Sequence, residues 1–432
     1  MLLEVKKNFS CNTVLARFME NPTVASLSAL LNQKVLAKGD CIPTRVYSDA
    51  LLPDEINPLD EVNPYIRRPR NILLTGANGF LGCFMLDHLI SITNANIFCL
   101  VRATSNQQAQ KRLEEALIAF GLEYLLGKPR IKVIAGNLES PYLGLNEDNY
   151  YSLCNSIDSI YHNAANVNHI YDYAYLYAVN VGSTLALLRF STTGINKGFH
   201  YISTLSAASN VNLSGEVVEA EPTNLPPAFI NNGYNLTKWV SERLVWQALK
   251  RGLQTAIYRP GNITGDSRYG ICQPRRNRIL LLIKGSLQLG IFPRWNMTFD
   301  LCPVDFIAKA IICLSLTKTS LPIYHLHNPQ SLTWVDYISS LIFFGYQFKF
   351  VEPAVWRSKL LQIDESNALF DIIYFYLDEE NEDISDMSLI QSHRTSEILS
   401  GLGISYPEIE SKLLLQHFRY LVESSFFPPP NT

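Results

Sequence analysis

Two residues with complementary chemistry stand four positions apart in the second half of the chain. Tyr234 and Lys238 belong to the run GYNLTKW, and residues at this spacing lie on one face of a helix. A phenol there can donate a proton to a carbonyl oxygen as hydride reaches the carbon, while a neighbouring ammonium group lowers the pKa of the phenol. The same spacing also occurs by chance on amphipathic helices, so the pair gains meaning only from its surroundings.

Hydroxyl side chains precede this pair at the end of an expected strand. The run Phe199–Ser203 is followed by Thr204, Leu205 and Ser206. A hydroxyl at this place would hydrogen-bond the same substrate oxygen as the phenol. We predict Thr204 for this role and keep Ser206 as a competitor, because sequence alone does not fix where the strand ends. Either hydroxyl could instead cap the strand end.

A glycine-rich turn lies far upstream of these residues. The run TGANGFLG at 75–82 follows the apolar segment 71–74 and precedes a helical pattern at 84–90. In a dinucleotide-binding turn, Gly76 would permit the tight turn, Gly79 would let backbone approach the pyrophosphate, and Gly82 would let helix pack on strand. The phosphates would then meet free N–H groups at a helix N-terminus. The alternative is an ordinary turn before a helix, which the flanking strand and helix disfavour.

The residue that reads the ribose is expected about 20 residues past the glycine turn, where the second strand ends. An acid there would bond a 2′-hydroxyl, whereas an arginine would accept a 2′-phosphate. The chain has Arg102 at this place, with Arg112 as a possible second clamp on the next helix. We therefore predict NADPH as the cofactor. The alternative is a solvated arginine without a specific role.

Apolar or β-branched runs alternate with helical patterns from residue 71 to residue 265. This alternation is typical of an α/β fold with a Rossmann-like, doubly wound parallel sheet. Beyond residue 265 the pattern becomes mixed, with helices near 278–288 and 304–316, a strand at 323–326 and an acidic stretch at 377–383, which we expect to be a solvated loop. The expected strands of the first region are Asn71–Leu74, Ile97–Val101, Ile131–Ala135, Ser159–His162, Phe199–Ser203 and Thr255–Arg259.

Four parts of the chain can be distinguished. Residues 1–36 read as two short helices, and 37–70 form a proline-rich linker and N-terminal flap without regular structure. Residues 71–265 are the expected NADPH-binding domain. Residues 266–432 are the expected smaller, mixed α/β subdomain that binds substrate.

Composition excludes several classes of protein. The chain has 432 residues, 47% of them hydrophobic, and a net charge of −3, so no global field favours nucleic acid or an anionic membrane. Its eight cysteines form no C-x-x-C pair, which favours reduced thiols over a disulfide scaffold or a metal site. No signal peptide pattern and no apolar run of membrane-spanning length occur. We expect a cytoplasmic protein without a metal.

Eight segments, in order, resemble the thioester reductase domains that end nonribosomal peptide and polyketide synthases, which belong to the extended short-chain dehydrogenase/reductase superfamily. The resemblance runs from about residue 37 to the C-terminus. It implies that NADPH is used to release a carrier-bound acyl or peptidyl thioester as an aldehyde, in some members reduced further to the alcohol. The segments are 72–82 (ILLTGANGFLG), 100–103 (LVRA), 161–168 (YHNAANVN), 180–184 (NVGST), 200–206 (HYISTLS), 233–239 (GYNLTKW), 258–265 (YRPGNITG) and 303–305 (PVD).

Carried over by position, the resemblance implies a catalytic set of Thr204, Tyr234 and Lys238. One departure is visible, because the family usually has Gly-Asp-Leu near the adenine where this chain has GNL at 136–138. The implied cofactor contacts, which also include Tyr234 and Lys238, are Thr75, Gly76, Asn78, Gly79, Phe80, Leu81, Gly82, Arg102, Arg112, Asn137, Leu138, Asn163, Ala164, Ala165, Pro260, Gly261, Asn262 and Ile263.

The first 31 residues resemble the second half of an acyl or peptidyl carrier protein. The serine that bears phosphopantetheine in carriers would precede Met1. We therefore expect the partner to be a carrier protein with a phosphopantetheine arm, acting in trans or placed upstream in a longer synthase.

Two other functions fit the same fold. An extended epimerase or dehydratase would act on a nucleotide sugar, but Arg102 and the carrier-like segment speak against it. A non-catalytic, NADPH-sensing binding protein would keep the glycines but would have no need for Tyr234 and Lys238 together. Tyr234 also favours reduction over the carbon–carbon cyclisation of related domains, which lack the tyrosine.

Overall fold

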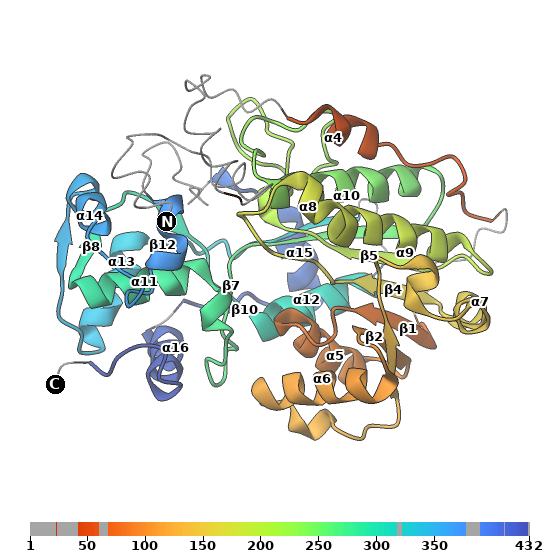
Figure 1. The fold of residues 1–432 in the computed structure, drawn as a ribbon, viewed down its shortest axis with the longest axis horizontal. Helices are drawn as coiled ribbons and strands as arrows, with labels where there is room; N and C mark the ends of the chain where they lie inside the picture. Colours follow the sequence, from red (N-terminus) through yellow and green to blue (C-terminus); the bar gives the residue numbers. More distant parts are fainter. Residues whose placement is uncertain are drawn as a thin grey trace.

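The computed structural model describes residues 23, 42–59, 68–317, 322–376, 389–409 and 411–430. A seven-stranded parallel sheet with the order β11-β6-β5-β4-β1-β2-β3 forms its centre (Figure 1). The direction of winding reverses between the neighbours β1 and β4, which is where doubly wound sheets bind ligands. The strands are β1 (Asn71–Thr75), β2 (Asn96–Arg102), β3 (Ile131–Gly136), β4 (Ser159–His162), β5 (Gly198–Ile202), β6 (Thr255–Pro260) and β11 (Ile323–Leu326).

Both faces of the sheet are covered by helices, which explains the continuous apolar runs of its strands. Ile72 and Leu74 of β1 belong to the core on one face, and Leu73 between them belongs to the core on the other. The first face is covered by α5 (Phe80–Ile92), α6 (Asn106–Ala119), α12 (Val304–Ser315) and α15 (His393–Gly401). The second face is covered by α7 (Glu147–Ser156), α8 (Tyr173–Tyr177), α9 (Ser183–Thr192) and α10 (Gly233–Lys250).

The expected α/β fold is confirmed, and each expected strand is present within one or two residues of its predicted ends. The sheet extends across the expected domain boundary at residue 265. Its edge strand β11 and the helices α12 and α15 come from beyond that residue, and α12 packs against α5, the helix that follows the glycine turn.

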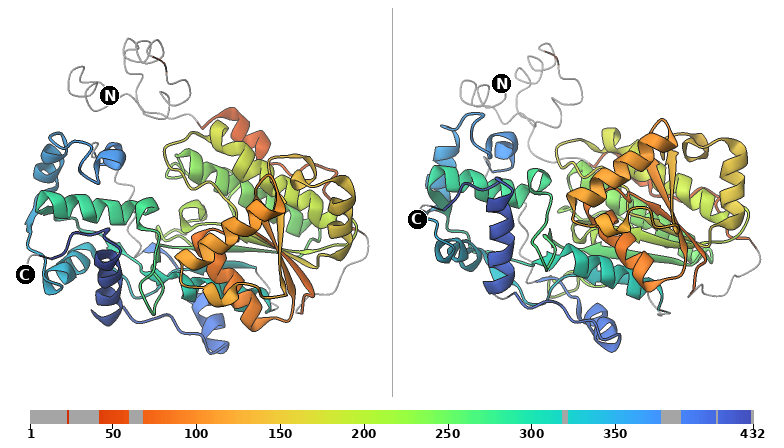
Figure 2. Two further views of the ribbon diagram at one scale, coloured as in Figure 1. Left: turned by 60° about the horizontal axis from the view of Figure 1, so that its bottom comes forward. Right: turned by 90° about the horizontal axis from the view of Figure 1, so that it is seen from below.

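The remainder of the C-terminal half forms a separate core beside the sheet (Figures 1 and 2). Trp295 lies at its centre, with ring centroids 5.1 Å from Trp334 and 5.4 Å from Trp356. This core is built by α11 (Arg278–Leu289), α13 (Trp334–Phe343), α14 (Pro353–Leu360) and α16 (Ser411–Glu423), together with the strand pair β8 (Ile291–Pro293) and β13 (Lys349–Val351).

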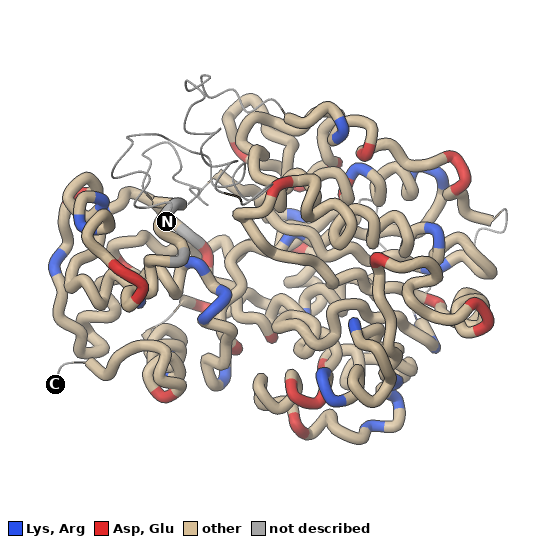
Figure 3. Tube along the Cα trace, in the orientation of Figure 1, with Lys and Arg blue, Asp and Glu red and all other residues tan. Residues whose placement is uncertain are grey.

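The segment before β1 departs from the expectation of an irregular linker. A short helix, α4 (Thr44–Asp49), begins directly after Pro43, and its Val46 is fully buried against the core that contains α10. The expected carrier-like helices at 1–36 and the acidic stretch at 377–383 lie outside the described residues. Within the described part of the chain, no helix is long and apolar enough to cross a membrane. Figure 3 shows acidic and basic residues interspersed along the trace, as the small net charge leads one to expect.

Arg251, at the end of α10, anchors the segment that follows α4. Its guanidinium donates to the carbonyls of Leu52, Pro53 and Ile56 at 2.8, 2.6 and 2.9 Å. We expect Arg251→Ala to lower the free energy of unfolding by about 1–3 kcal/mol, because three carbonyls lose a charged donor. Urea unfolding would measure this. Lys250→Ala, at the next position, serves as the control, and an equal loss in both variants would contradict the anchoring role.

Candidate active site

The predicted proton donor and its lysine lie on one buried side of α10. Asn232 caps the helix, since its side chain accepts from the backbone N–H of Asn235, so Tyr234 falls in the first turn and Lys238 in the second. Only 6% of Tyr234 and 3% of Lys238 is exposed. The sequence spacing therefore places a phenol and an amine side by side in a site shielded from water.

The amine of Lys238 points to the carboxyl end of β5. Its Nζ donates to the carbonyl of Ile202 at 2.7 Å and lies 4.7 Å from the ring centroid of Tyr201. Burial lowers the pKa of Lys238 to about 7, although the carboxylate of Glu242, one helical turn further on, acts in the opposite direction. The amine thus titrates near neutral pH.

The phenol of Tyr234 behaves differently from the sequence expectation. We expected the neighbouring ammonium to lower its pKa, but burial raises the pKa of Tyr234. Desolvation is the cause of this shift, and the amine of Lys238 directs its proton at the backbone carbonyl of Ile202 instead. A phenol with a raised pKa stays protonated at neutral pH, as a proton donor must. The ring of His169 packs edge-on against it, with centroids 5.0 Å apart.

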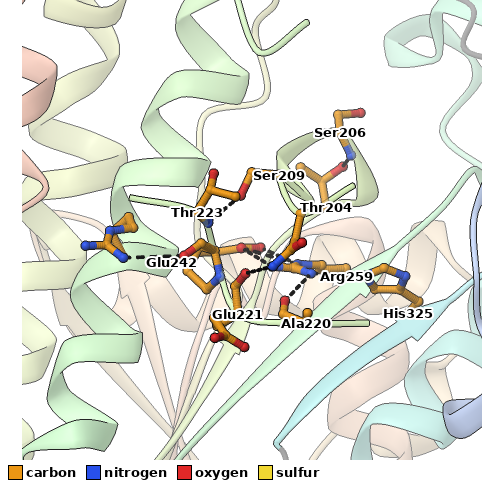
Figure 4. Close-up of polar contacts among 12 residues, drawn as sticks. Thr204, Ser206, Ser209, Ala220, Glu221, Thr223, Glu242, Arg259 and His325 are labelled. Carbon is orange, nitrogen blue, oxygen red and sulfur yellow. Dashed lines mark hydrogen bonds and ion pairs between the residues drawn. The ribbon is translucent and has the colours of Figure 1, made fainter. Parts of the chain in front are cut away.

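The two candidate hydroxyls, those of Thr204 and Ser206, differ in burial and in hydrogen bonding (Figure 4). Thr204 follows β5 directly and is half-buried, and its Oγ1 accepts from the backbone N–H of Ser206 at 3.3 Å. Within the described residues Thr204 Oγ1 donates no hydrogen bond, so its proton is available to a ligand. Ser206 is exposed in the short helical turn Leu205–Ala207. This geometry is compatible with Thr204 as the hydroxyl that meets the substrate oxygen.

The glycine turn has the shape that a dinucleotide requires. Gly76 has φ of 69°, and a Cβ atom there would lie 2.8 Å from the backbone nitrogen of Ala164. A Cβ at Gly82 would lie 1.9 Å from the carbonyl oxygen of Gly76. The helix α5 starts at Phe80 with neither an acidic residue in its first turn nor a side-chain cap, so its first N–H groups are free for phosphate. Asn78 and Leu81 lie in the same turn.

The segment after β4 meets this turn at the point where the winding reverses. Asn163 Nδ2 donates to the carbonyl of Gly76 at 3.3 Å, and the backbone N–H of Ala164 donates to Thr75 Oγ1 at 3.2 Å. Thr75 is fully buried and also bonds His162 Nδ1 at 3.0 Å. Thr75 thus holds the backbone of the segment that continues with the small residues Ala164 and Ala165.

The expected ribose contacts, Arg102 and Arg112, and the segment expected near the adenine lie around the carboxyl ends of β2 and β3. Arg102 is 74% exposed and only 3.7 Å from Glu139 in a weak surface pair, so its guanidinium is free to move to a phosphate. Arg112 of α6 donates to the backbone carbonyl of Arg102. Asn137 bonds within its own turn, to Ser140 Oγ and the N–H of Glu139, and Leu138 packs against the core.

The loop after β6 is held by a carboxylate that the sequence analysis missed. Asp300 is fully buried, and its Oδ1 accepts from both the backbone N–H and Nδ2 of Asn262 at 3.2 Å. The N–H of Gly261 donates to Leu326 of β11 at 3.0 Å. These contacts fix the segment from Pro260, the last residue of β6, to Ile263 in the short strand β7 (Ile263–Thr264).

Comparison with known proteins decides the family. Residues 74–311 match the family described as male sterility protein, an NAD-binding domain. The terminal R domain from the myxalamid PKS-NRPS biosynthetic pathway is 34% identical, with a TM-score of 0.81 over 90% of this chain and 99% of that structure. The chain belongs to the family of terminal reductase domains.

Two further relatives extend this assignment. The reductase domain is 30% identical over 98% of its length to a linear gramicidin synthase from Brevibacillus parabrevis, but it spans only 8% of that protein. A thiolation-reductase di-domain from an archaeal non-ribosomal peptide synthetase shares the fold at 24% identity, with a TM-score of 0.76 over 99% of this chain and 90% of that structure. The chain is a nicotinamide-dependent oxidoreductase of this family.

Sequence reasoning also missed a buried ion pair in the reductase domain. Glu242 of α10 and Arg259 of β6 are both fully buried, and Arg259 Nη2 lies 2.7 Å from Glu242 Oε2. Two signals in the sequence could have identified them. Glu242 continues the four-residue spacing of Tyr234 and Lys238, and Arg259 is a charged residue inside an otherwise apolar strand.

The packing at Gly82 gives a test of the cofactor turn. We expect Gly82→Ala to destabilise the reductase domain by about 1–3 kcal/mol, because the new methyl group overlaps the carbonyl of Gly76. We also expect NADPH affinity to fall by about tenfold or more, since the turn must move. Thermal unfolding and fluorescence titration with NADPH would measure both. Gly401→Ala is the control, because a Cβ there meets no atom within 4 Å; equal NADPH affinity in both variants would contradict the assignment.

Proposed function

We propose that the chain catalyses NADPH-dependent reductive release of a carrier-bound acyl or peptidyl thioester as an aldehyde. The observation that carries this proposal is the hydrogen bond from Lys238 to the carbonyl of Ile202, which brings the helix that bears Tyr234 to the end of β5, directly before Thr204. The family of terminal reductase domains supplies the class of substrate.

The side chains of the site fit the proton chemistry of this reaction. NADPH, when bound, supplies hydride to the thioester carbon. The protonated phenol of Tyr234 donates its proton to the carbonyl oxygen, and the free proton of Thr204 makes a hydrogen bond to the same oxygen. The resulting thiohemiacetal loses its hydroxyl proton as the carbon–sulfur bond breaks, which gives the aldehyde and the free thiol of the carrier arm. Buried Lys238, one helical turn from Tyr234, would supply a cation near the phenol and would help to hold the ribose of the cofactor.

The proposal also specifies the nucleotide that is used, the partner that presents the thioester and the region that binds the acyl chain. Arg102, exposed at the end of β2, supports NADPH over NADH. The di-domain architecture of the archaeal relative supports a carrier partner that presents the thioester on a phosphopantetheine arm. The separate C-terminal core, from α11 to α16, is proposed to bind the acyl chain, since it lies beside the sheet as the second body of the structure (Figure 2).

Mass spectrometry of the products tests the function directly. The protein is incubated with NADPH and a panel of carrier-bound acyl thioesters, while NADPH oxidation is followed by absorbance. We expect aldehyde or alcohol with the thioesters, and no oxidation with a nucleotide sugar. Turnover of a nucleotide sugar alone would instead favour an epimerase or dehydratase.

Removal of the phenol proton tests the role of Tyr234. We expect Tyr234→Phe to lower turnover by about a hundredfold or more, because only the proton donor is deleted, and to leave NADPH affinity nearly unchanged. Steady-state kinetics and a binding titration would measure these effects. Tyr175→Phe, an exposed tyrosine of α8, is the control. Near-normal turnover in Tyr234→Phe would show that another group donates the proton.

Cofactor preference tests Arg102. We expect Arg102→Ala to reduce the preference for NADPH over NADH by about 1.5–3 kcal/mol, a factor of roughly 10 to 150, because a charged donor to phosphate is lost. Arg102→Asp should cancel or invert the preference. Lys111→Ala on α6 removes an exposed cation that pairs with Glu115 and should leave the ratio unchanged. Equal use of both nucleotides by the unaltered protein would refute this role.

A further inference from the structure

The buried ion pair Glu242–Arg259 lies one helical turn beyond Lys238. Arg259 Nε donates to the two carboxylate oxygens of Glu242 at 3.0 and 3.2 Å, and Nη2 donates to Oε2 at 2.7 Å. Both side chains are inaccessible to solvent. Such a pair is costly to desolvate, and replacing it by apolar residues is often neutral or stabilising, so stability alone is a weak explanation for it.

The other nitrogen of Arg259 joins the pair to two further segments (Figure 4). Nη1 donates to the carbonyl of Ala220, in the long loop after Thr204, and to His325 Nε2 on β11, each at 3.0 Å. Because arginine can only donate, Nε2 of His325 must be the acceptor, and its Nδ1 then donates to the carbonyl of Gln391 at 2.7 Å. One guanidinium thus connects the catalytic helix, the loop that begins at the predicted catalytic hydroxyl, and the segment that leads into α15.

The charges around Lys238 single out Glu242. Tyr234 and Glu242 each stand four positions from Lys238 on α10. The ring of Tyr201 on β5 and the imidazole of His162 on β4 also lie near the amine. Burial raises the pKa of both tyrosines and lowers the pKa of His162 to about 3, so these three are neutral at pH 7. The carboxylate of Glu242, which is paired with the guanidinium of Arg259, is the one of these groups that favours the charged amine.

We propose that Glu242, locked by Arg259, is a positioning residue that holds the charge on the Lys238 amine and fixes α10 against the loop after Thr204. It touches neither substrate nor cofactor and acts through Lys238. The assignment of Lys238 to the reaction rests on the proposed function, but the electrostatic link between the two side chains does not.

Two substitutions distinguish the effect of the charge of Glu242 from the effect of its side-chain length. Glu242→Gln removes the charge and keeps the shape, whereas Glu242→Asp keeps the charge and shortens the side chain. With the charged amine as the active form, kcat/KM for thioester reduction falls as pH rises through the pKa of Lys238. We expect the midpoint of this fall to move down by about one pH unit in Glu242→Gln. In Glu242→Asp it should stay within about 0.3 unit of the parent while kcat decreases.

A second measurement uses the protein without NADPH. Carbon-13 NMR of the lysine Cε groups, with the signal assigned by Lys238→Met, gives the titration midpoint of the amine directly. We expect the same downward shift in Glu242→Gln and none in Glu242→Asp. If no thioester is reduced by the unaltered protein, the proposed function fails, and this titration still tests the role of Glu242.

Control variants distinguish this role from a general loss of structure. Glu55→Gln breaks an exposed pair, 2.9 Å from Arg189, and should leave both midpoints unchanged. If Glu242→Gln does not fold, the double variant Glu242→Gln/Arg259→Met, which leaves no unpaired buried charge, replaces it. A smaller downward shift is then expected, because the opposing charge of Arg259 is removed together with the carboxylate. Equal midpoints in the parent and the charge-removing variant, or equal shifts in Glu242→Gln and Glu242→Asp, would overturn the proposal.

Discussion

The contact between two backbone segments, at Gly76 and at Ala164, is the constraint on which the site depends. The turns that follow β1 and β4 lie so close that a single Cβ at Gly76 would overlap the second segment. This proximity follows from the reversal of winding between neighbouring parallel strands. It places the free N–H groups of α5 on one side and the ends of β4 and β5 on the other, so that phosphate-binding and proton-donating groups share one edge of the sheet.

Burial shifts the pKa values of Tyr234 and Lys238 in opposite directions. The same exclusion of water that raises the pKa of the Tyr234 phenol lowers the pKa of the Lys238 amine. An acid is thereby kept in its protonated form next to a base that titrates near neutral pH. The helix α10 carries both side chains, and every residue of its first two turns is buried.

The fold could be predicted from the sequence because each strand is a continuous apolar run between helical patterns. The glycine turn could be predicted because a side chain at Gly76 or Gly82 would overlap neighbouring backbone atoms, so glycine is required at that spacing. The pKa of Tyr234 was predicted in the wrong direction, since desolvation depends on neighbours such as His169 that spacing does not disclose. The pairing of Glu242 with Arg259 and the short helix α4 were also missed. Contacts between distant segments decide both. The catalytic role of Thr204 stays a prediction.

The pairing of the edge strand β11 with β6 joins the two halves of the chain and affects the order in which they can fold during synthesis. It pairs with β6, yet about 60 residues of the C-terminal region separate the two strands, so β6 has an open edge during synthesis until that whole segment has left the ribosome. The loop that begins at Pro260 also reaches its final conformation only after β11 has been synthesised, since Gly261 donates to a carbonyl of β11. A fragment that ended near residue 265 would therefore leave the edge of β6 unpaired and prone to association with other strands. It would also lose the hydrogen bond that holds the loop after β6 at the site.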